Sequence, residues 1–217
     1  MNTGTRMTRK GRMHTDLSAT QKWDIKDFAK HHAEPETQNS KLVTCNRFMS
    51  IIFETTRLIV RQFTENDKDN FFLLSGNETV MQYIRPVSTK EESDKFLLEN
   101  IAAYEKNPNA GRWAVMEKAN GTFAGSFAII PMLSQPENIQ LGYSLRVENW
   151  GRGFATELTK TGLDYFMKHY SHPVIHGITE VLNAASQKVL LKAGFQPAGS
   201  FMEEEKELLM FVVKRND

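Results

Sequence analysis

The apolar positions of this chain change character near Met49. Large apolar residues are sparse before Leu42, whereas from Ile51 onward they recur at the spacings of strands and helices. A segment with so few apolar residues cannot bury enough surface to offset the entropy it would lose on ordering. We therefore predict a flexible, disordered N-terminal extension over residues 1–48 and one folded domain over residues 49–217. Whether the basic residues of the extension bind a partner or serve no function stays open.

Within the predicted domain, strands and helices are distinguished by the period of their apolar positions. Alternation with a period of two predicts strands over residues 51–63, 112–118, 122–130, 139–147, 173–179, 196–201 and 208–214. Apolar positions three or four residues apart predict helices over residues 89–107, 153–170 and 184–193. A further helix is predicted from Thr64 onward, because Thr64 and Asp67 have the spacing of a helix cap.

The elements follow one another as a strand, two helices, three strands, a helix, a strand, a helix and two strands. This order is typical of one mixed α/β (α+β) domain. We expect a sheet of about seven strands flanked by about four helices. A ligand site is expected where the central strands end at their carboxyl termini.

Composition and charge exclude several classes of protein. The formal net charge of +1 gives no overall indication of a nucleic-acid or membrane-surface partner. No apolar run approaches the roughly 20 residues of a membrane span. The single Cys45 excludes an intrachain disulfide and a cysteine-based zinc site, and it fits a reducing, cytoplasmic location. His169, His172 and His176 are not at metal-ligand spacing on one element, so we predict no metal site.

The segment from Trp150 to Thr156 contains two glycines, Gly151 and Gly153, between a predicted strand and a predicted helix. Such a turn can place unpaired helical N–H groups around a phosphate. A dinucleotide site would have a third glycine where Thr156 stands, and a nucleotide P-loop would have a lysine that is absent. Two interpretations remain open: a plain turn between strand and helix, or a pyrophosphate site.

Three other segments accompany this turn in chain order: Thr55–Arg61, Leu141–Leu145, and Asn183–Ser186 with the following Lys192–Phe195. Taken together, the segments resemble the GNAT superfamily, and most of all its branch of ribosomal-protein alanine and serine N-acetyltransferases. The resemblance covers roughly Phe53 to Lys214. It implies a central twisted mixed sheet splayed between its fourth and fifth strands. It also implies acetyl-CoA as cofactor and direct attack by a primary amine, without an acyl-enzyme.

The resemblance further implies which residues hold the cofactor. The pyrophosphate is expected on the backbone N–H groups of Arg152, Gly153, Phe154, Ala155 and Thr156. The pantetheine arm is expected to pair with the backbone of Ser144, Leu145, Arg146 and Val147. Asn183 is expected to bind this arm through its side-chain amide. Ser186 either bonds the thioester and protonates the leaving thiolate, or is an ordinary residue of the first helical turn.

The catalytic base is not evident from the sequence. Relatives often have a glutamate at the position of Gln140, which cannot take a proton. A water relay, another carboxylate such as Glu117 or Glu180, and the absence of a strong base are the alternatives. Tyr143 either lines the acceptor groove or packs in the core.

A site without a strong base favours an α-amine, whose pKa is near 8, over a lysine amine near 10.4. We therefore expect an N-acetyltransferase acting on a protein N-terminus such as that of a ribosomal protein, as a monomer or homodimer. The alternatives are a small amine, amino acid or antibiotic as acceptor, and a catalytically degenerate sensor that only binds acyl-CoA.

Overall fold

The computed structural model describes residues 50–132, 135–203 and 205–215. The predicted extension and Cys45 lie outside these residues. The described strands are β1 (Ile51–Glu54), β2 (Leu58–Arg61), β3 (Gly111–Glu117), β4 (Phe123–Pro131), β5 (Ile139–Leu145), β6 (Val174–Glu180), β7 (Gln196–Glu203) and β8 (Lys206–Lys214). The described helices are η1 (Glu65–Asp67), α2 (Lys68–Ser75), α3 (Glu78–Met81), α4 (Lys90–Ala103), η2 (Val147–Asn149), α5 (Phe154–His169) and α6 (Ala184–Lys192). The predicted mixed α/β class is confirmed.

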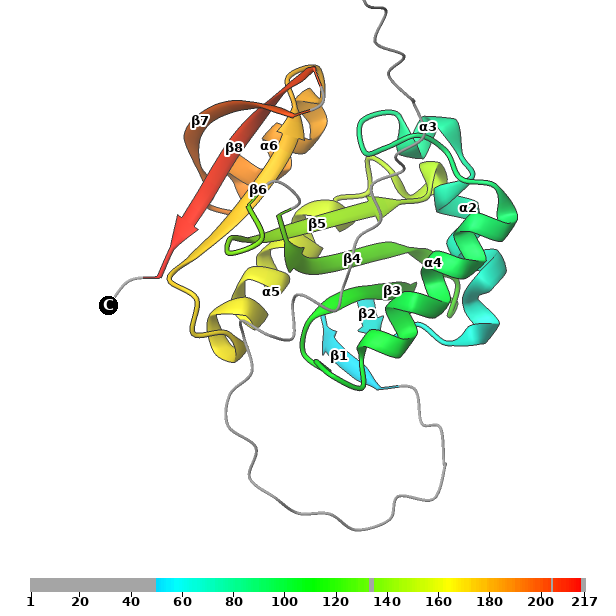
Figure 1. Ribbon diagram of the computed structural model, residues 1–217. Helices are drawn as coiled ribbons and strands as arrows, with labels where there is room; N and C mark the ends of the chain where they lie inside the picture. The colour runs from blue at the N-terminus through cyan, green and yellow to red at the C-terminus, as the bar shows by residue number, and fades with distance from the viewer. Residues whose placement is uncertain (1–49, 133–134, 204, 216–217) are drawn as a thin grey trace, which may run out of the picture.

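The strands form one sheet in the order β1-β2-β3-β4-β5-β6-β8-β7 (Figure 1). All neighbours are antiparallel except β5 and β6, which are parallel. These two strands of seven residues pair only at Ile139 with Ile175 and at Gln140 with His176, after which they diverge. The predicted splay in the middle of the sheet is therefore confirmed, and it opens toward the carboxyl end of β5.

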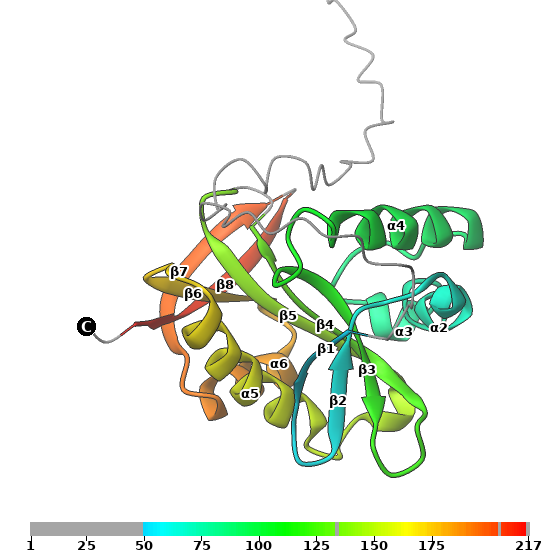
Figure 2. The ribbon, with the colours of Figure 1, turned by 90° about the horizontal axis from the view of Figure 1, so that it is seen from below.

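Helices cover both faces of the sheet, with α2, α3 and α4 on one side and α5 and α6 on the other (Figure 2). The larger of two hydrophobic cores includes the buried side chains of Trp113 and Phe127 from the sheet and of Phe166 from α5. A Cβ on Gly162 of α5 would lie 2.1 Å from the ring of Phe127, so only glycine lets the helix pack this closely. A second, smaller core lies beneath α2, α3 and α4.

Two predicted elements are each divided in the structure. The predicted strand 51–63 is the hairpin of β1 and β2, because Thr55 closes a turn: its N–H donates to Leu58 O and its Oγ1 accepts from Leu58 N, both at 2.9 Å. The helix predicted from Thr64 is divided at Gly76, and the side chain of Asn77 caps α3 by accepting from Val80 N at 3.1 Å. These two divisions account for eight strands instead of about seven and five α-helices instead of about four among the described residues.

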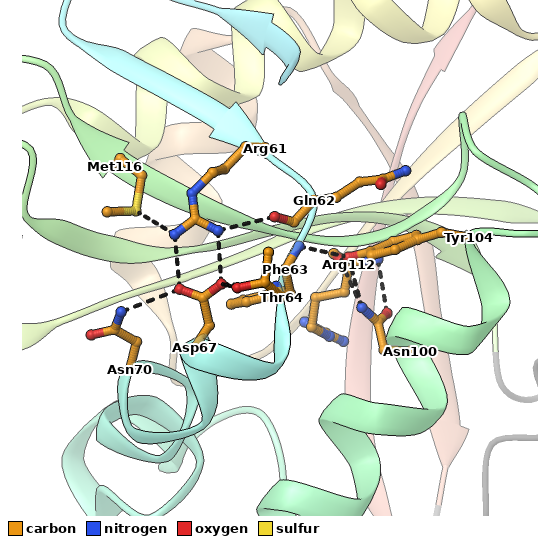
Figure 3. Close-up of polar contacts among 10 residues, drawn as sticks. All are labelled: Arg61, Gln62, Phe63, Thr64, Asp67, Asn70, Asn100, Tyr104, Arg112 and Met116. Atoms are coloured by element: carbon orange, nitrogen blue, oxygen red, sulfur yellow. Dashed lines mark hydrogen bonds and ion pairs between the residues drawn. The ribbon is translucent and has the colours of Figure 1, made fainter. Parts of the chain in front are cut away.

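A buried ion pair fastens the start of the helical layer to the sheet (Figure 3). The guanidinium of Arg61 donates to both carboxylate oxygens of Asp67 at 2.8 Å, and Thr64 N donates to Asp67 Oδ2 at 2.8 Å. Burial by itself would raise the pKa of Asp67, but the bonds from Arg61 and Thr64 outweigh it and lower the pKa to about 2. Asp67 is therefore a carboxylate at any physiological pH.

Candidate functional site

The glycine-rich turn lies at the start of α5. Gly151 has φ +71° and Gly153 has φ +81°, a left-handed conformation that glycine adopts without strain. Gly153 is the N-cap residue of α5, and Glu157 N donates to Gly153 O at 3.1 Å. The N–H groups that precede Glu157 in the first turn have no acceptor within the helix. A Cβ on Gly151 would meet no atom within 4 Å, so this side of the turn is open. The turn thus fits a pyrophosphate.

Glu157 ties this turn to the distant β1–β2 hairpin. Its carboxylate accepts hydrogen bonds from Arg57 N at 2.8 Å, from Arg57 Nε at 2.7 Å and from the hydroxyl of Thr55. Arg57 Nη1 also donates to Arg152 O at 2.9 Å, within the turn itself. Burial would raise the pKa of Glu157, but the bonds from Thr55 and Arg57 outweigh it and lower the pKa. The ion pair of Arg57 and Glu157 therefore attaches the glycine-rich turn to the β1–β2 hairpin.

Arg152 makes a second ion pair beside the same turn. Its guanidinium donates to both carboxylate oxygens of Glu117 and, at 2.8 Å, to Asn149 Oδ1. The hydrogen bonds from Arg152 lower the pKa of Glu117. Since Arg57 and Arg152 are each paired with a glutamate, their charges are already balanced, and the backbone N–H groups remain as donors for an anion.

The edge of β5 that faces β6 is free of strand partners beyond Gln140. An extended ligand arm can therefore approach the backbone there, but several groups of the expected residues Ser144, Leu145, Arg146 and Val147 already have partners within the chain. Leu145 O already accepts from Trp150 Nε1 at 2.8 Å, and Arg146 N donates to Ala124 O at 3.0 Å on the β4 side. The side chain of Ser144 is turned to β4, where it shares a hydrogen bond of 2.9 Å with Ser126.

Tyr143 and Ser186 meet where α6 begins. The hydroxyl of Tyr143 lies 3.5 Å from Ser186 Oγ, within donating distance. The ring of Tyr143 also packs against the larger core, which agrees with the second of the two interpretations offered by the sequence. Burial raises the pKa of Tyr143, which keeps this hydroxyl protonated at neutral pH. Asn183 caps α6 by accepting from Ser186 N at 3.0 Å through Oδ1, and its Nδ2 remains as a donor.

Gln140 lies on the other face of the sheet from Tyr143, since side chains alternate along β5. Its Nε2 donates to Pro131 O at 3.3 Å. Its neighbour in β6 is His176, whose Nδ1 lies 3.1 Å from Ile139 O.

Neither carboxylate considered as a base lies beside Gln140. Glu180 follows His176 by four residues, a distance of roughly 13 Å along a diverging strand, and it pairs with Lys206 at 2.7 Å. Glu117 is bound to Arg152 at the glycine-rich turn.

Sequence reasoning missed the tertiary partners of the turn. Thr55 and Arg57 were noted as part of a strand, and nothing in the sequence paired them with Glu157. In the described residues, no group of three or more His, Cys, Asp or Glu side chains is arranged to hold a metal ion. None of the described helices combines the length and the apolar character needed to cross a membrane.

Comparison with known proteins gives a family and a fold. Residues 57–196 match the family described as acetyltransferase (GNAT) domain. The chain is 27% identical over 150 residues to the uncharacterized N-acetyltransferase YoaA of Bacillus subtilis, which covers 68% of this chain and 84% of that protein. A GNAT-family acetyltransferase from Bacillus anthracis aligns with a TM-score of 0.65 at 20% identity, over 76% of this chain and 98% of that one.

A second solved structure adds a bound cofactor. RimL, described as a ribosomal L7/L12 alpha-N-protein acetyltransferase in complex with coenzyme A, aligns with a TM-score of 0.64 at 18% identity. The alignment covers 76% of this chain and 98% of that one. Likeness at this level of identity shows a shared fold.

Proposed function

This chain belongs to the GNAT acetyltransferase family, and we propose that it acetylates the α-amine at the N-terminus of a protein. As a member of the family it is an acyl-CoA-dependent N-acetyltransferase that uses acetyl-CoA. The observation that supports the proposed acceptor is the placement of Glu117 and Glu180, which pair with Arg152 and Lys206 and do not lie beside Gln140. The likeness to RimL supports the same acceptor class.

The residues of the chain fit acetyl-CoA, which supplies the acyl thioester when bound. The backbone N–H groups from Arg152 to Thr156 would hold its pyrophosphate, at the positive end of the α5 dipole. The end of β5 and the residues that follow it, Ser144–Val147, would hold the pantetheine arm through the backbone groups that are not already bonded within the chain, as Leu145 O and Arg146 N are. Asn183 Nδ2 would donate to the same arm, while Asn183 Oδ1 continues to cap α6.

Tyr143 and Ser186 would manage the proton of the leaving thiol. Ser186 Oγ would donate a proton to the thiolate at the α6 face, and the hydroxyl of Tyr143, which lies 3.5 Å from Ser186 Oγ, would replace that proton. The raised pKa of Tyr143 keeps the phenol protonated for this role. General-acid assistance of this kind contributes about 10²–10⁴-fold to a rate.

The acceptor amine would arrive at the opposite face of the sheet, beside Gln140 and Gly142. Without a carboxylate base there, we take the reactive fraction to be the free amine already present in solution. With a pKa near 8, roughly a tenth of α-amines are neutral at pH 7, against fewer than about one in a thousand lysine amines with a pKa near 10.4. An α-amine is thus the acceptor that this site can use without a carboxylate that first takes a proton from the ammonium form.

The acceptor is tested by following thiol release from acetyl-CoA with two matched peptides. One peptide has a free N-terminus and no lysine, and the other has an acetylated N-terminus and one lysine. We expect turnover of the first peptide only, with kcat/KM rising as the pH passes through about 8. A flat profile between about pH 6 and 9, or equal turnover of the lysine peptide, contradicts the α-amine. Binding of acetyl-CoA without turnover of any amine supports the sensor instead.

The cellular location and the state of assembly are part of this proposal. A protein N-terminus as acceptor, together with a single cysteine, supports a cytoplasmic location. A monomer or homodimer is still the predicted state of assembly, to be checked by measuring the molar mass in solution.

A further inference from the structure

Two arginines outside the acetyl-CoA site gather around one aromatic ring. The guanidinium carbon of Arg85, in the loop after α3, lies 4.7 Å from the centre of the Phe96 ring. The guanidinium carbon of Arg112, at the start of β3, lies 6.0 Å from the same centre. Phe96 belongs to α4, so three separate segments bring these side chains together. Two like charges held this close repel each other unless an anion lies between them.

Neither guanidinium has an anionic partner in the described part of the chain. Arg85 Nε is buried without a hydrogen-bond acceptor. Arg112 forms hydrogen bonds with Asn100 and Tyr104, but only through its backbone N–H and carbonyl (Figure 3). Burial first and then the neighbouring charge of Arg85 lower the pKa of Arg112 to about 10, and burial lowers that of Arg85. Unpaired charges in such surroundings are costly, and a bound anion would offset that cost.

The register of the sheet places Arg112 on the side of the proposed acceptor. Arg112 pairs with Ala128 of β4, and Ala128 pairs with Gly142 of β5. Residues directly opposite one another point to the same face, so Arg112 shares its face with Gly142 and Gln140. A Cβ on Gly142 would meet no atom within 4 Å, which leaves open space above that residue. Two strand spacings separate the backbones of Arg112 and Gly142 by about 9–10 Å.

We propose that Arg85 and Arg112 bind a carboxylate carried by the acceptor, so that the enzyme selects amines that bear an acidic group. This inference rests on the proposed function, because it places the reacting amine beside Gln140 and Gly142. Guanidinium groups recognise carboxylates through paired, charge-assisted hydrogen bonds. An extended peptide rises about 3.3 Å per residue, so the spacing fits an acidic side chain at the second or third residue of an N-terminus.

The experiment compares acceptors that differ in one charge. The peptide amides Ser-Ala-Asp-Ala and Ser-Ala-Asn-Ala test a peptide carboxylate, and glutamate against glutamine tests a small acceptor. We expect at least a tenfold higher kcat/KM for the acidic peptide with the wild-type enzyme. Arg85→Gln and Arg112→Gln should each reduce this ratio toward one. Lys95→Gln removes one charge from an exposed position of α4 next to Phe96, and it should leave the ratio unchanged.

A charge-reversal variant tests the carboxylate site independently of how much of the variant protein is folded. Because the ratio is taken within one preparation, the folded fraction of a variant cancels. Arg112→Glu should make Ser-Ala-Lys-Ala amide a better acceptor than the aspartate peptide. The backbone hydrogen bonds of Arg112 are available to any residue at this position, so the substitution keeps them.

The possible outcomes distinguish failure of the carboxylate site from failure of the proposed acetylation of protein N-termini. Equal turnover of acidic and neutral peptides by the wild type overturns the carboxylate site and leaves the N-acetyltransferase of α-amines standing. A preference for glutamate without one for the acidic peptide supports the carboxylate site and overturns the protein N-terminus. A wild-type preference that survives Arg85→Gln and Arg112→Gln overturns the assignment of these two arginines.

Discussion

Arg57 and Glu157 are 100 residues apart in the chain, yet Arg57 Nε donates to the Glu157 carboxylate at 2.7 Å. The same carboxylate accepts from Arg57 N at 2.8 Å, and Arg57 Nη1 donates to Arg152 O at 2.9 Å. The pair therefore joins the β1–β2 hairpin to both sides of the glycine-rich turn. It fixes the turn without itself offering an unpaired charge to a ligand.

Removing the charge of Glu157 should loosen this turn. In Glu157→Gln, the bonds from Arg57 lose their charge assistance, and we expect KM for acetyl-CoA to rise about tenfold, which corresponds to about 1.4 kcal/mol. We expect kcat to change little, because Glu157 does not reach the reacting atoms. Steady-state kinetics with varied acetyl-CoA measure both values. Asp164→Asn, an exposed neutralisation on the same helix, is the control, and an unchanged KM in Glu157→Gln would exclude the positioning role.

Two glycines with similar backbone angles allow strain to be separated from binding. Gly153 has φ +81° in the glycine-rich turn, and Gly121 has φ +67° in the β3–β4 turn. Alanine at either position is strained, at a cost of about 1–2 kcal/mol in stability. Only Gly153→Ala should weaken the binding of acetyl-CoA, because its Cβ would stand 3.4 Å from Arg57 Nη2 in the turn that would hold the pyrophosphate. Calorimetric titration with coenzyme A and thermal melting of both variants check this, and equal affinities would refute it.

Asn183 has two roles that different substitutions separate. Asn183→Ala removes both the helix cap and the amide donor, and it should cost about 1 kcal/mol in stability besides raising KM for acetyl-CoA. Asn183→Asp keeps an oxygen that can accept from Ser186 N, so stability should be preserved while KM still rises. Urea unfolding measures the first effect and kinetics the second. A normal KM in Asn183→Asp would show that the amide does not bind the cofactor.

The hydroxyl pair of Tyr143 and Ser186 should influence turnover more than binding. Tyr143→Phe keeps the ring in the core, and Ser186→Ala keeps the start of α6, so each removes one hydroxyl only. We expect kcat to fall by about 10–100-fold in each variant, with KM for acetyl-CoA within about twofold. The double variant should be little worse than either single variant, since both act in one relay. Unchanged kcat in both single variants would mean that the thiolate obtains its proton elsewhere.

Asp67 should make stability depend on pH in the acid range. Its folded pKa of about 2 lies below the ordinary 3.8, so its contribution is present above about pH 4 and is lost as the pH falls through 2. The shift corresponds to roughly 2 kcal/mol. Asp67→Asn should therefore destabilise the protein by about 3 kcal/mol at pH 7 and by much less at pH 2.

Urea unfolding of Asp67→Asn at several pH values measures this difference. The control is Asp94→Asn, which removes a partner of Lys90 in an ion pair at the surface and should cost less than about 1 kcal/mol. A constant difference between wild type and Asp67→Asn from pH 7 to pH 2 would contradict the lowered pKa.

Much of the fold followed from local patterns. The spacing of apolar residues identified the segments that form the sheet and its helices, and the Asn120-Gly121 turn joins β3 to β4 as expected. The divisions at Thr55 and Gly76 were missed, because a short turn stabilised by its own side chains barely interrupts the pattern of apolar positions. The splay between β5 and β6 was predicted only from the family resemblance, because the sequence of one strand does not indicate where a neighbouring strand diverges from it.

By itself, the sequence determined features that depend on neighbouring residues: glycines at 151 and 153 where the backbone is left-handed, and the helix cap formed by Thr64 and Asp67 three residues apart. Only the tertiary structure decided which charges meet. It paired Arg57 with Glu157, bound Glu117 to Arg152, and brought Arg85 and Arg112 to the same ring of Phe96. Backbone conformation is set by the residue and its near neighbours, whereas an ion pair depends on strand register and helix packing between segments far apart in the chain.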